Sequence, residues 1–198
     1  MAIDQVHDLQ QVYRKILHSM SRPGTISSIQ KNVESVDYNL PCYDATLLSA
    51  MTLLDAEVTF HILSDNQHDL IEKISDYTLA RFAPIDKADF VIVLREDTEA
   101  TIQQALEQCK DGNLIDPQQS STWIIESSLL SNNGELTLTG PGVQHTAQLH
   151  TSFSTALWQA RNERTKEYPI GIDLIFADEA SQIVCVPRTT SVKLMGVN

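Results

Sequence analysis

The sequence lacks long apolar runs, paired cysteines and a secretion signal, and each absence excludes a class of protein. No apolar run approaches the roughly 18 residues of a membrane-spanning helix. The N-terminus shows neither the basic start nor the apolar block of a signal peptide. The three cysteines of the 198-residue chain form no CxxC pair, so neither a zinc site nor a disulfide framework is expected. We therefore expect a cytoplasmic protein with reduced thiols and no membrane association.

Basic residues are also scarce. Lys and Arg number 14 against 26 Asp and Glu, which gives a formal net charge of −12 at pH 7. Such an acidic surface repels a phosphate backbone, so no nucleic-acid partner is expected. The charge is compatible with a local basic pocket for a small phosphate ligand, and with docking on a basic protein.

The common catalytic signatures are missing. The chain contains no G-x-G-x-x-G, G-x-x-x-x-G-K-[ST], H-E-x-x-H or G-x-S-x-G sequence. Its histidines form no ligand set, and Cys109 lies on the inward stripe of an expected helix, where packing explains it better than nucleophilic catalysis. We therefore expect no metal site, no cofactor and no catalytic residue.

Apolar periodicity predicts five helices. The first covers residues 4–20 and the second, mostly buried, covers residues 43–54. Three more begin near residues 65, 97 and 151. The apolar stripe of the first helix consists of Val6, Leu9, Val12, Tyr13, Ile16, Leu17 and Met20.

Apolar, β-leaning runs predict the strands, and the unbroken run at residues 88–94 indicates a strand covered on both faces. The other runs lie at residues 25–29, 58–62, 123–125, 136–138, 146–149, 172–176, 183–186 and 191–195. The polar stretch 30–40 is expected to be a surface loop. Helices alternate with strands early and strands cluster late, which predicts a single α/β domain over residues 1–198, a three-layer α/β/α sandwich with a mixed sheet.

Four clusters of glycine and proline punctuate the chain. They are Arg22-Pro23-Gly24, Gly140-Pro141-Gly142, Pro169-Ile170-Gly171-Ile172-Asp173 and Pro187-Arg188-Thr189-Thr190. Asp173 stands inside an apolar strand, where a lone carboxylate is costly without a partner. A hairpin would bring Arg188 near it, so we predict an ion pair between the two. That pair either pins a sheet edge or forms part of a ligand site.

Arg188 and the two threonines after it offer a forked cation and two hydroxyls, groups that suit phosphate. Arg22 places a second guanidinium on a rigid turn. Neither feature is specific alone, because such turns also occur without a ligand.

Taken in order, the clusters resemble the PhnH family, a subunit of the bacterial carbon–phosphorus (C-P) lyase system for phosphonate use. The matching stretches are Tyr13-Arg14, Met20-Ser21-Arg22-Pro23-Gly24, Leu53-Leu54-Asp55, Leu138-Thr139-Gly140-Pro141-Gly142, Tyr168-Pro169-Ile170-Gly171-Ile172-Asp173 and Pro187-Arg188-Thr189-Thr190. They span nearly the whole chain. Tyr13 and Tyr168 stand where phenylalanine is expected, and Val186 where leucine is usual.

The resemblance implies a fold like the large domain of pyridoxal-phosphate-dependent transferases, without a working cofactor site. It implies a homodimer that joins PhnG, PhnI and PhnJ subunits in a core complex. That complex couples an alkylphosphonate to ribose 5-triphosphate and releases adenine from ATP. The subunit itself has no assigned catalytic residue. Candidate ligand-binding or structural residues are Arg22, Gly24, Asp55, Gly140, Gly142, Asp173, Arg188, Thr189 and Thr190.

Three functions remain open from the sequence. The first is a dimeric, non-catalytic subunit of an enzyme complex, which predicts exposed apolar patches for self-association and for partners. The second is a stand-alone phosphate- or nucleotide-binding enzyme, in which Arg22, Arg188 and the adjoining threonines converge on a pocket. In the third, the clusters serve only the turns and edges of the fold.

Overall fold

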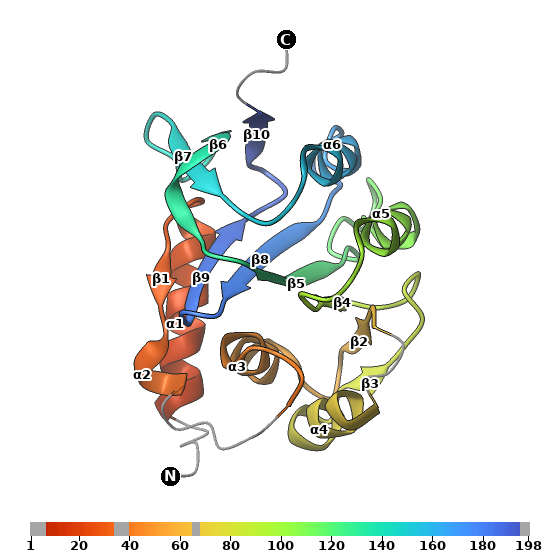
Figure 1. The fold of residues 1–198 in the computed structure, drawn as a ribbon. Helices are drawn as coiled ribbons and strands as arrows, with labels where there is room; N and C mark the ends of the chain where they lie inside the picture. Colours follow the sequence, from red (N-terminus) through yellow and green to blue (C-terminus); the bar gives the residue numbers. More distant parts are fainter. Residues whose placement is uncertain (1–6, 34–39, 65–67, 195–198) are drawn as a thin grey trace.

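The centre of the molecule is a seven-stranded mixed sheet. The structure, a computed structural model, describes residues 7–33, 40–64 and 68–194. The strand order is β1-β9-β8-β5-β4-β2-β3 (Figure 1). The strands are β1 (Ser27–Ser28), β2 (Thr59–Ile62), β3 (Arg81–Phe82), β4 (Phe90–Val93), β5 (Thr122–Ser127), β8 (Asp173–Asp178) and β9 (Gln182–Val186). β3, β2, β4, β5 and β8 run parallel, whereas β9 is antiparallel to both β8 and β1. A mixed sheet was predicted, and it is confirmed.

Both faces of this sheet are buried, which explains the unbroken apolar run of β4. Successive side chains of a strand point to opposite faces. Val91 and Val93 accordingly join one core cluster, and Ile92 joins the other. Trp123 of β5 belongs to the first cluster and Ile124 to the second. The sheet therefore separates two cores, each closed by its own outer layer.

Helices lie on both faces (Figure 1). α1 (His7–Ser21), α3 (Asp44–Leu53) and α4 (His68–Thr78) cover one face, with the short α2 (Gln30–Val33) beside α1; α5 (Glu99–Gln108) and α6 (Thr155–Arg164) cover the other. Hydroxyl oxygens of Thr98 and Ser154 cap α5 and α6. None of the helices in the described ranges is long and apolar enough to cross a membrane.

A small antiparallel sheet completes the second face. It has the order β10-β6-β7 and consists of β6 (Ser131–Thr139), β7 (Ala147–His150) and β10 (Ser191–Leu194). The strands on either side of the Gly140–Gly142 turn do pair, with Leu136 opposite Leu149. Both leucines are buried in the same cluster as Trp123. This outer layer thus contains strands as well as helices, where the sequence predicted a layer of helices.

α1 is rotated from its predicted orientation. Val12, Ile16 and Ser19 face the core, whereas Tyr13 and Leu17 are 49% and 55% exposed. The reason is Ser19, whose hydroxyl donates to the Thr25 carbonyl (3.0 Å) and contacts the Ser27 hydroxyl (3.0 Å), drawing β1 against this side of the helix. Because Ser19 is polar, a prediction from the spacing of apolar residues could not place it at this contact.

Three other expectations need comment. Part of the predicted loop 30–40 is helical, because α2 covers residues 30–33. Residues 4–6 of the first predicted helix and the predicted helix start near residue 65 lie outside the described residues. α6 begins at Thr155, slightly later than expected, because the capping hydroxyl is that of Ser154.

α1 depends on a strand from the far end of the sequence. It packs on β9, and the Cys185 thiol lies 3.8 Å from the carbonyl oxygen of Ile16. β1 pairs with the same strand, with Ser27 opposite Ile183. The N-terminal elements are therefore held by residues near the C-terminus.

Candidate functional site

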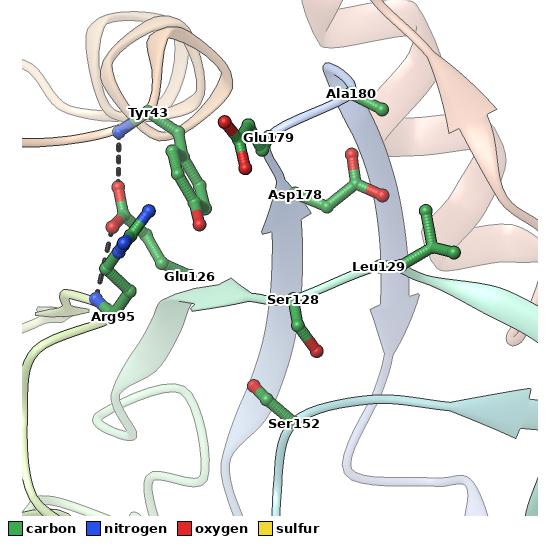
Figure 2. A pocket seen from close by; sticks show the side chains of 9 residues that line it. All are labelled: Tyr43, Arg95, Glu126, Ser128, Leu129, Ser152, Asp178, Glu179 and Ala180. Atoms are coloured by element: carbon green, nitrogen blue, oxygen red, sulfur yellow. Dashed lines mark hydrogen bonds between the residues drawn. The ribbon is translucent and has the colours of Figure 1, made fainter.

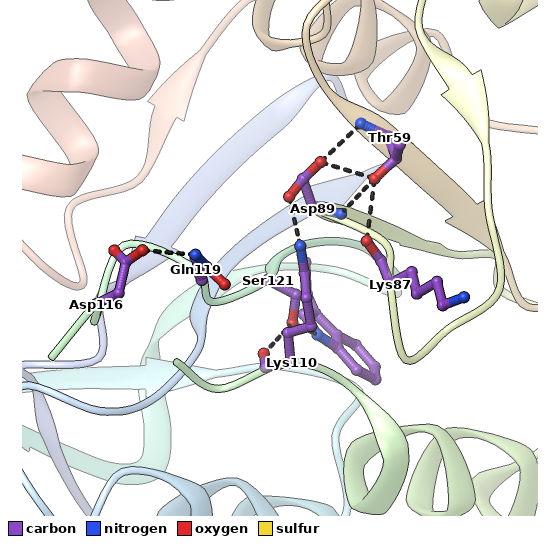
Figure 3. A network of polar contacts seen from close by, with 8 residues as sticks. Thr59, Lys87, Asp89, Lys110, Asp116, Gln119 and Ser121 are labelled. Atoms are coloured by element: carbon purple, nitrogen blue, oxygen red, sulfur yellow. Dashed lines mark hydrogen bonds and ion pairs between the residues drawn. The ribbon is translucent and has the colours of Figure 1, made fainter. Parts of the chain in front are cut away.

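A polar network ties together the amino ends of β2, β4 and β5 (Figure 3). The Asp89 carboxylate accepts hydrogen bonds from the backbone nitrogen of Thr59 (2.8 Å) and from its hydroxyl (2.7 Å), and pairs with Lys110 (2.5 Å). The carbonyl of Lys110 in turn accepts from Ser121, whose hydroxyl accepts from the Trp123 indole (3.0 Å). Burial raises the pKa of Asp89, but the bonds from Lys110 and Thr59 outweigh it and hold that pKa below its ordinary value. Each of these groups is hydrogen-bonded or ion-paired within the network, which indicates a structural role for it.

The predicted ion pair between Asp173 and Arg188 is present at the same edge of the sheet. One carboxylate oxygen accepts from Arg188 Nη2 (2.5 Å) and Nε (3.1 Å), and the other accepts from the Arg188 backbone nitrogen (2.8 Å). Arg188 Nη1 donates to the Pro117 carbonyl (2.8 Å). Both side chains are about four-fifths buried, with exposed fractions of 18% and 20%. The pair therefore joins the start of β8, the end of β9 and the loop before β5.

The turn clusters meet each other near this pair. A Cβ atom on Gly142, at φ +81°, would lie 2.3 Å from the Ser21 carbonyl oxygen, and one on Gly140 would lie 2.8 Å from that of Thr189. These close approaches join the end of α1 and the 187–190 turn to the β6–β7 hairpin. At both positions a side chain is excluded by main-chain atoms, which explains the glycines.

A cleft of about 480 Å³ opens where α6, the 187–190 turn and the hairpin turn meet. Among the described residues that line it, three are basic, five carry a hydroxyl and none is acidic. They are Pro141, Arg161, Asn162, Thr165, Lys166, Tyr168, Arg188, Thr189, Thr190, Ser191 and Val192. The cleft brings together three of the sequence-predicted site residues, Arg188, Thr189 and Thr190.

Arg161 is the feature of this cleft that the sequence analysis missed. Its side chain is fully buried, and it donates to the carbonyls of Pro187 (2.7 Å) and Thr190 (2.9 Å) and to the Asn162 amide oxygen (3.3 Å). Burial lowers the pKa of Arg161 to about 10, and the nearby Asp173 charge acts in the opposite direction. The signal was available, since Arg161 follows the buried Leu157 by four residues on the same helix face.

The other predicted residues do not line the cleft. Asp55 is exposed, and its carboxylate accepts from the Glu57 backbone nitrogen (2.9 Å) in a local turn. Arg22 is exposed at the end of α1, where its backbone nitrogen donates to the His18 carbonyl (3.1 Å). Gly24 packs against the Leu138 side chain. Arg22 is therefore not among the residues that line the cleft with Arg188, as the stand-alone enzyme would require.

A second cavity, of about 640 Å³, lies at the carboxyl ends of the parallel strands (Figure 2). Parallel sheets commonly hold ligands at this edge. Its lining residues are Tyr43, Arg95, Glu126, Ser128, Leu129, Ser152, Asp178, Glu179 and Ala180. None of them was predicted from the sequence, although Glu126 follows a buried apolar run directly, the kind of signal that could have indicated this edge.

Glu126 is the buried carboxylate of that cavity. One of its oxygens accepts from the Tyr43 backbone nitrogen (2.5 Å) and the other from the Arg95 backbone nitrogen (3.1 Å). Burial raises the pKa of Glu126, and these two bonds offset the effect only in part. A raised carboxyl pKa is typical of general acids and bases. Here, however, each oxygen already accepts a hydrogen bond from the backbone at the start of α3 or after the end of β4. The geometry therefore indicates a structural role, in which Glu126 holds these two segments together.

Asp178 closes the same edge from β8. Its two carboxylate oxygens accept from the backbone nitrogens of Gln182 (2.8 Å) and Leu130 (3.1 Å). Within the described ranges, no group of three or more His, Cys, Asp and Glu side chains could hold a metal ion. Glu126 and Asp178 therefore line the cavity while their carboxylates hold the neighbouring loops through backbone hydrogen bonds.

Comparison with known proteins gives two matches. A family model described as bacterial phosphonate metabolism protein (PhnH) matches residues 2–193. A relative from Stutzerimonas stutzeri, provisionally named C-P lyase subunit protein HtxG, is 29% identical over 191 residues. The aligned part covers 96% of this chain and 88% of that relative.

Proposed function

Because the chain belongs to the PhnH family of bacterial phosphonate metabolism proteins, we propose that it is a docking subunit of a C-P lyase complex without a catalytic centre of its own. The observation that carries the proposal is the family match over residues 2–193, and the name of the HtxG relative supports it. The partners are subunits of the PhnG, PhnI and PhnJ type, and the complex acts in the cytoplasm. The free state of all three cysteines agrees with that compartment.

Two exposed apolar surfaces support a docking role. The α1 surface consists of Tyr13 and Leu17, one helical turn apart. The loop surface consists of Leu114, Ile115 and Tyr168, which are 61%, 97% and 75% exposed. Its two loops are held close, because the Asp111 carbonyl accepts a hydrogen bond (2.8 Å) from the Gly171 nitrogen. Large apolar side chains that are exposed next to one another are typical of interaction sites, whereas single ones are not.

We assign the α1 surface to a second copy of the chain and the loop surface to the other subunits. Tyr13→Asp with Leu17→Asp should convert the homodimer to a monomer in sedimentation equilibrium. Leu114→Asp with Ile115→Asp should leave the dimer intact and abolish co-purification with the other subunits. Each double variant is the control for the other. A wild-type chain that is monomeric, or one that fails to co-purify with the other subunits, would refute the assignment.

The lack of a catalytic centre has its own test. The purified chain should turn over neither a phosphonate nor ATP, and should restore activity when added to the remaining subunits. Product formation by the chain alone would refute the proposal. It would also favour the stand-alone enzyme.

We propose further that the fold is related to the large domain of pyridoxal-phosphate-dependent transferases, without the cofactor. The mostly parallel seven-stranded sheet with helices on both faces supports this relation. Incubation with pyridoxal phosphate should give no visible absorption from a lysine Schiff base. A visible absorption band that persists after dialysis would show that the chain binds the cofactor and would contradict this part of the proposal.

A further inference from the structure

The cleft beside α6 has a charge opposite to that of the molecule. The chain carries 26 acidic and 14 basic residues. The described lining of this cleft nevertheless contains Arg161, Lys166 and Arg188 and no acidic residue. Such a local reversal of sign in an acidic protein attracts anions.

The net charge of the cleft can be counted from its ion pairs. Asp173 neutralises Arg188, and the exposed Glu163 pairs with Lys166 along α6. Arg161 takes part in none of the ion pairs formed by the described residues. About one net positive charge therefore remains, and Arg161, the most deeply buried of the three cations, forms no ion pair with a described residue although the Asp173 charge acts on it.

The environment of Arg161 goes beyond what the fold requires. Its three hydrogen bonds reach neutral oxygens, and its Nε is buried without a partner. Holding two carbonyls of the 187–190 turn needs only neutral donors, whereas burying a full charge is costly unless an opposite charge approaches. The lining residue Thr190 likewise keeps a buried hydroxyl without a partner. Both features fit a ligand that accepts hydrogen bonds, and the charge of Arg161 favours a negative one.

We propose that this cleft binds a small molecule through a single phosphate or phosphonate group. Arg161 supplies the charge from below, while Lys166 and the exposed hydroxyls of Thr189 and Ser191 contact the anion from the rim. One net positive charge suits one oxyanion group and not a triphosphate. A volume of about 480 Å³ leaves room for the organic part of the ligand. The cleft shares Tyr168 with the loop surface, but binding of a small anion itself requires no other subunit.

The test titrates the purified full-length chain with inorganic phosphate, methylphosphonate and ribose 5-phosphate at constant ionic strength. Affinities come from calorimetry, and the unfolding midpoint is followed in parallel. At ten times the dissociation constant, a bound anion should raise the midpoint by about 3–5 °C. The tightest of the three ligands identifies the source of the group, a phosphonate, a phosphate ester or free phosphate.

Two variants locate the site. Lys166→Glu reverses an exposed charge, so it should fold normally and weaken binding about three- to tenfold. Its matched control, Lys15→Glu, makes the same change on an exposed lysine of α1 that does not line the cleft, and should bind as the wild type does. Arg161→Met should abolish binding if it folds, as judged by circular dichroism.

Specific results would overturn the proposal. One is a failure of all three ligands to bind at about 10 mM, far above ordinary metabolite affinities. Another is an equal loss of affinity in Lys166→Glu and Lys15→Glu. That result would mean that anion binding depends on the overall charge of the protein and not on the cleft. ATP is titrated in the same way, and tighter binding of ATP than of all three ligands would contradict a site for one oxyanion group.

Discussion

The ion pair between Asp173 and Arg188 should account for a measurable share of stability. Its carboxylate accepts three hydrogen bonds from one residue, and both side chains are about four-fifths buried. Removing one partner of a buried pair costs about 3–5 kcal/mol, and partial exposure places this pair at the lower end. We expect Asp173→Ala and Arg188→Ala each to lower the free energy of unfolding by about 3 kcal/mol. The double variant should lose about 4 kcal/mol, less than the sum of the two single losses, which gives a coupling energy of about 2 kcal/mol.

Urea denaturation provides the measurement. With a slope of about 3 kcal/mol per molar urea, each single variant should shift the midpoint down by about 1 M. The control is the pair Lys166–Glu163 on α6, which is 67% and 64% exposed and should couple by less than about 0.5 kcal/mol. A coupling energy for Asp173 and Arg188 no larger than that of the control would refute the reasoning.

We also propose that residues 1–198 form one domain, so all variants should unfold in a single transition.

Three further predictions concern the turns, the acid range and the thiols. Gly142→Ala should lower the free energy of unfolding by about 3 kcal/mol, because it forces a left-handed conformation on alanine and a clash with the Ser21 carbonyl, while Pro141→Ala in the same turn should cost under about 1 kcal/mol. Because the folded pKa of Asp89 is depressed, the stability that it contributes is present above its unfolded pKa of about 3.9 and is lost as the pH falls through the folded value. Asp89→Asn should therefore make the urea midpoint less dependent on pH below about pH 4. An unchanged pH dependence would contradict this. Burial raises the pKa of Cys42 to about 12, so a thiol reagent at neutral pH should label it far more slowly in the native chain than in urea, and equal rates would show that the thiol is accessible.

Local patterns predicted most of the strands because burial repeats at short range. The run at residues 88–94 is apolar throughout since β4 faces a core on each side. The hairpin around Gly140 and Gly142 was predictable because its turn residues and its flanking strands lie close in sequence. The pair of Asp173 with Arg188 followed from one isolated charge and one short hairpin.

Features that depend on tertiary contacts were not predictable. The exposure of Tyr13 reflects the approach of β1 to Ser19, which no helical periodicity encodes. The spacing of Arg161 from Leu157 could have indicated its burial, but its hydrogen-bond acceptors could not be predicted, because they come from residues 187 and 190. Glu126 shows the same limit, since its two donors lie 83 and 31 residues away.

The attachment of the first helix to the ninth strand has a consequence for synthesis. Residues 7–28 emerge early from the ribosome, yet the strand that covers them ends at Val186. Until that segment is made, α1 can pack on α3 but lacks its contact with β9, and β1 lacks its pairing strand, because such long-range contacts form late. A chain truncated before residue 182 should therefore lose order at its beginning as well as its end. If α1 joins two copies of the chain, as proposed above, only subunits that have completed β9 would present that helix in its folded position.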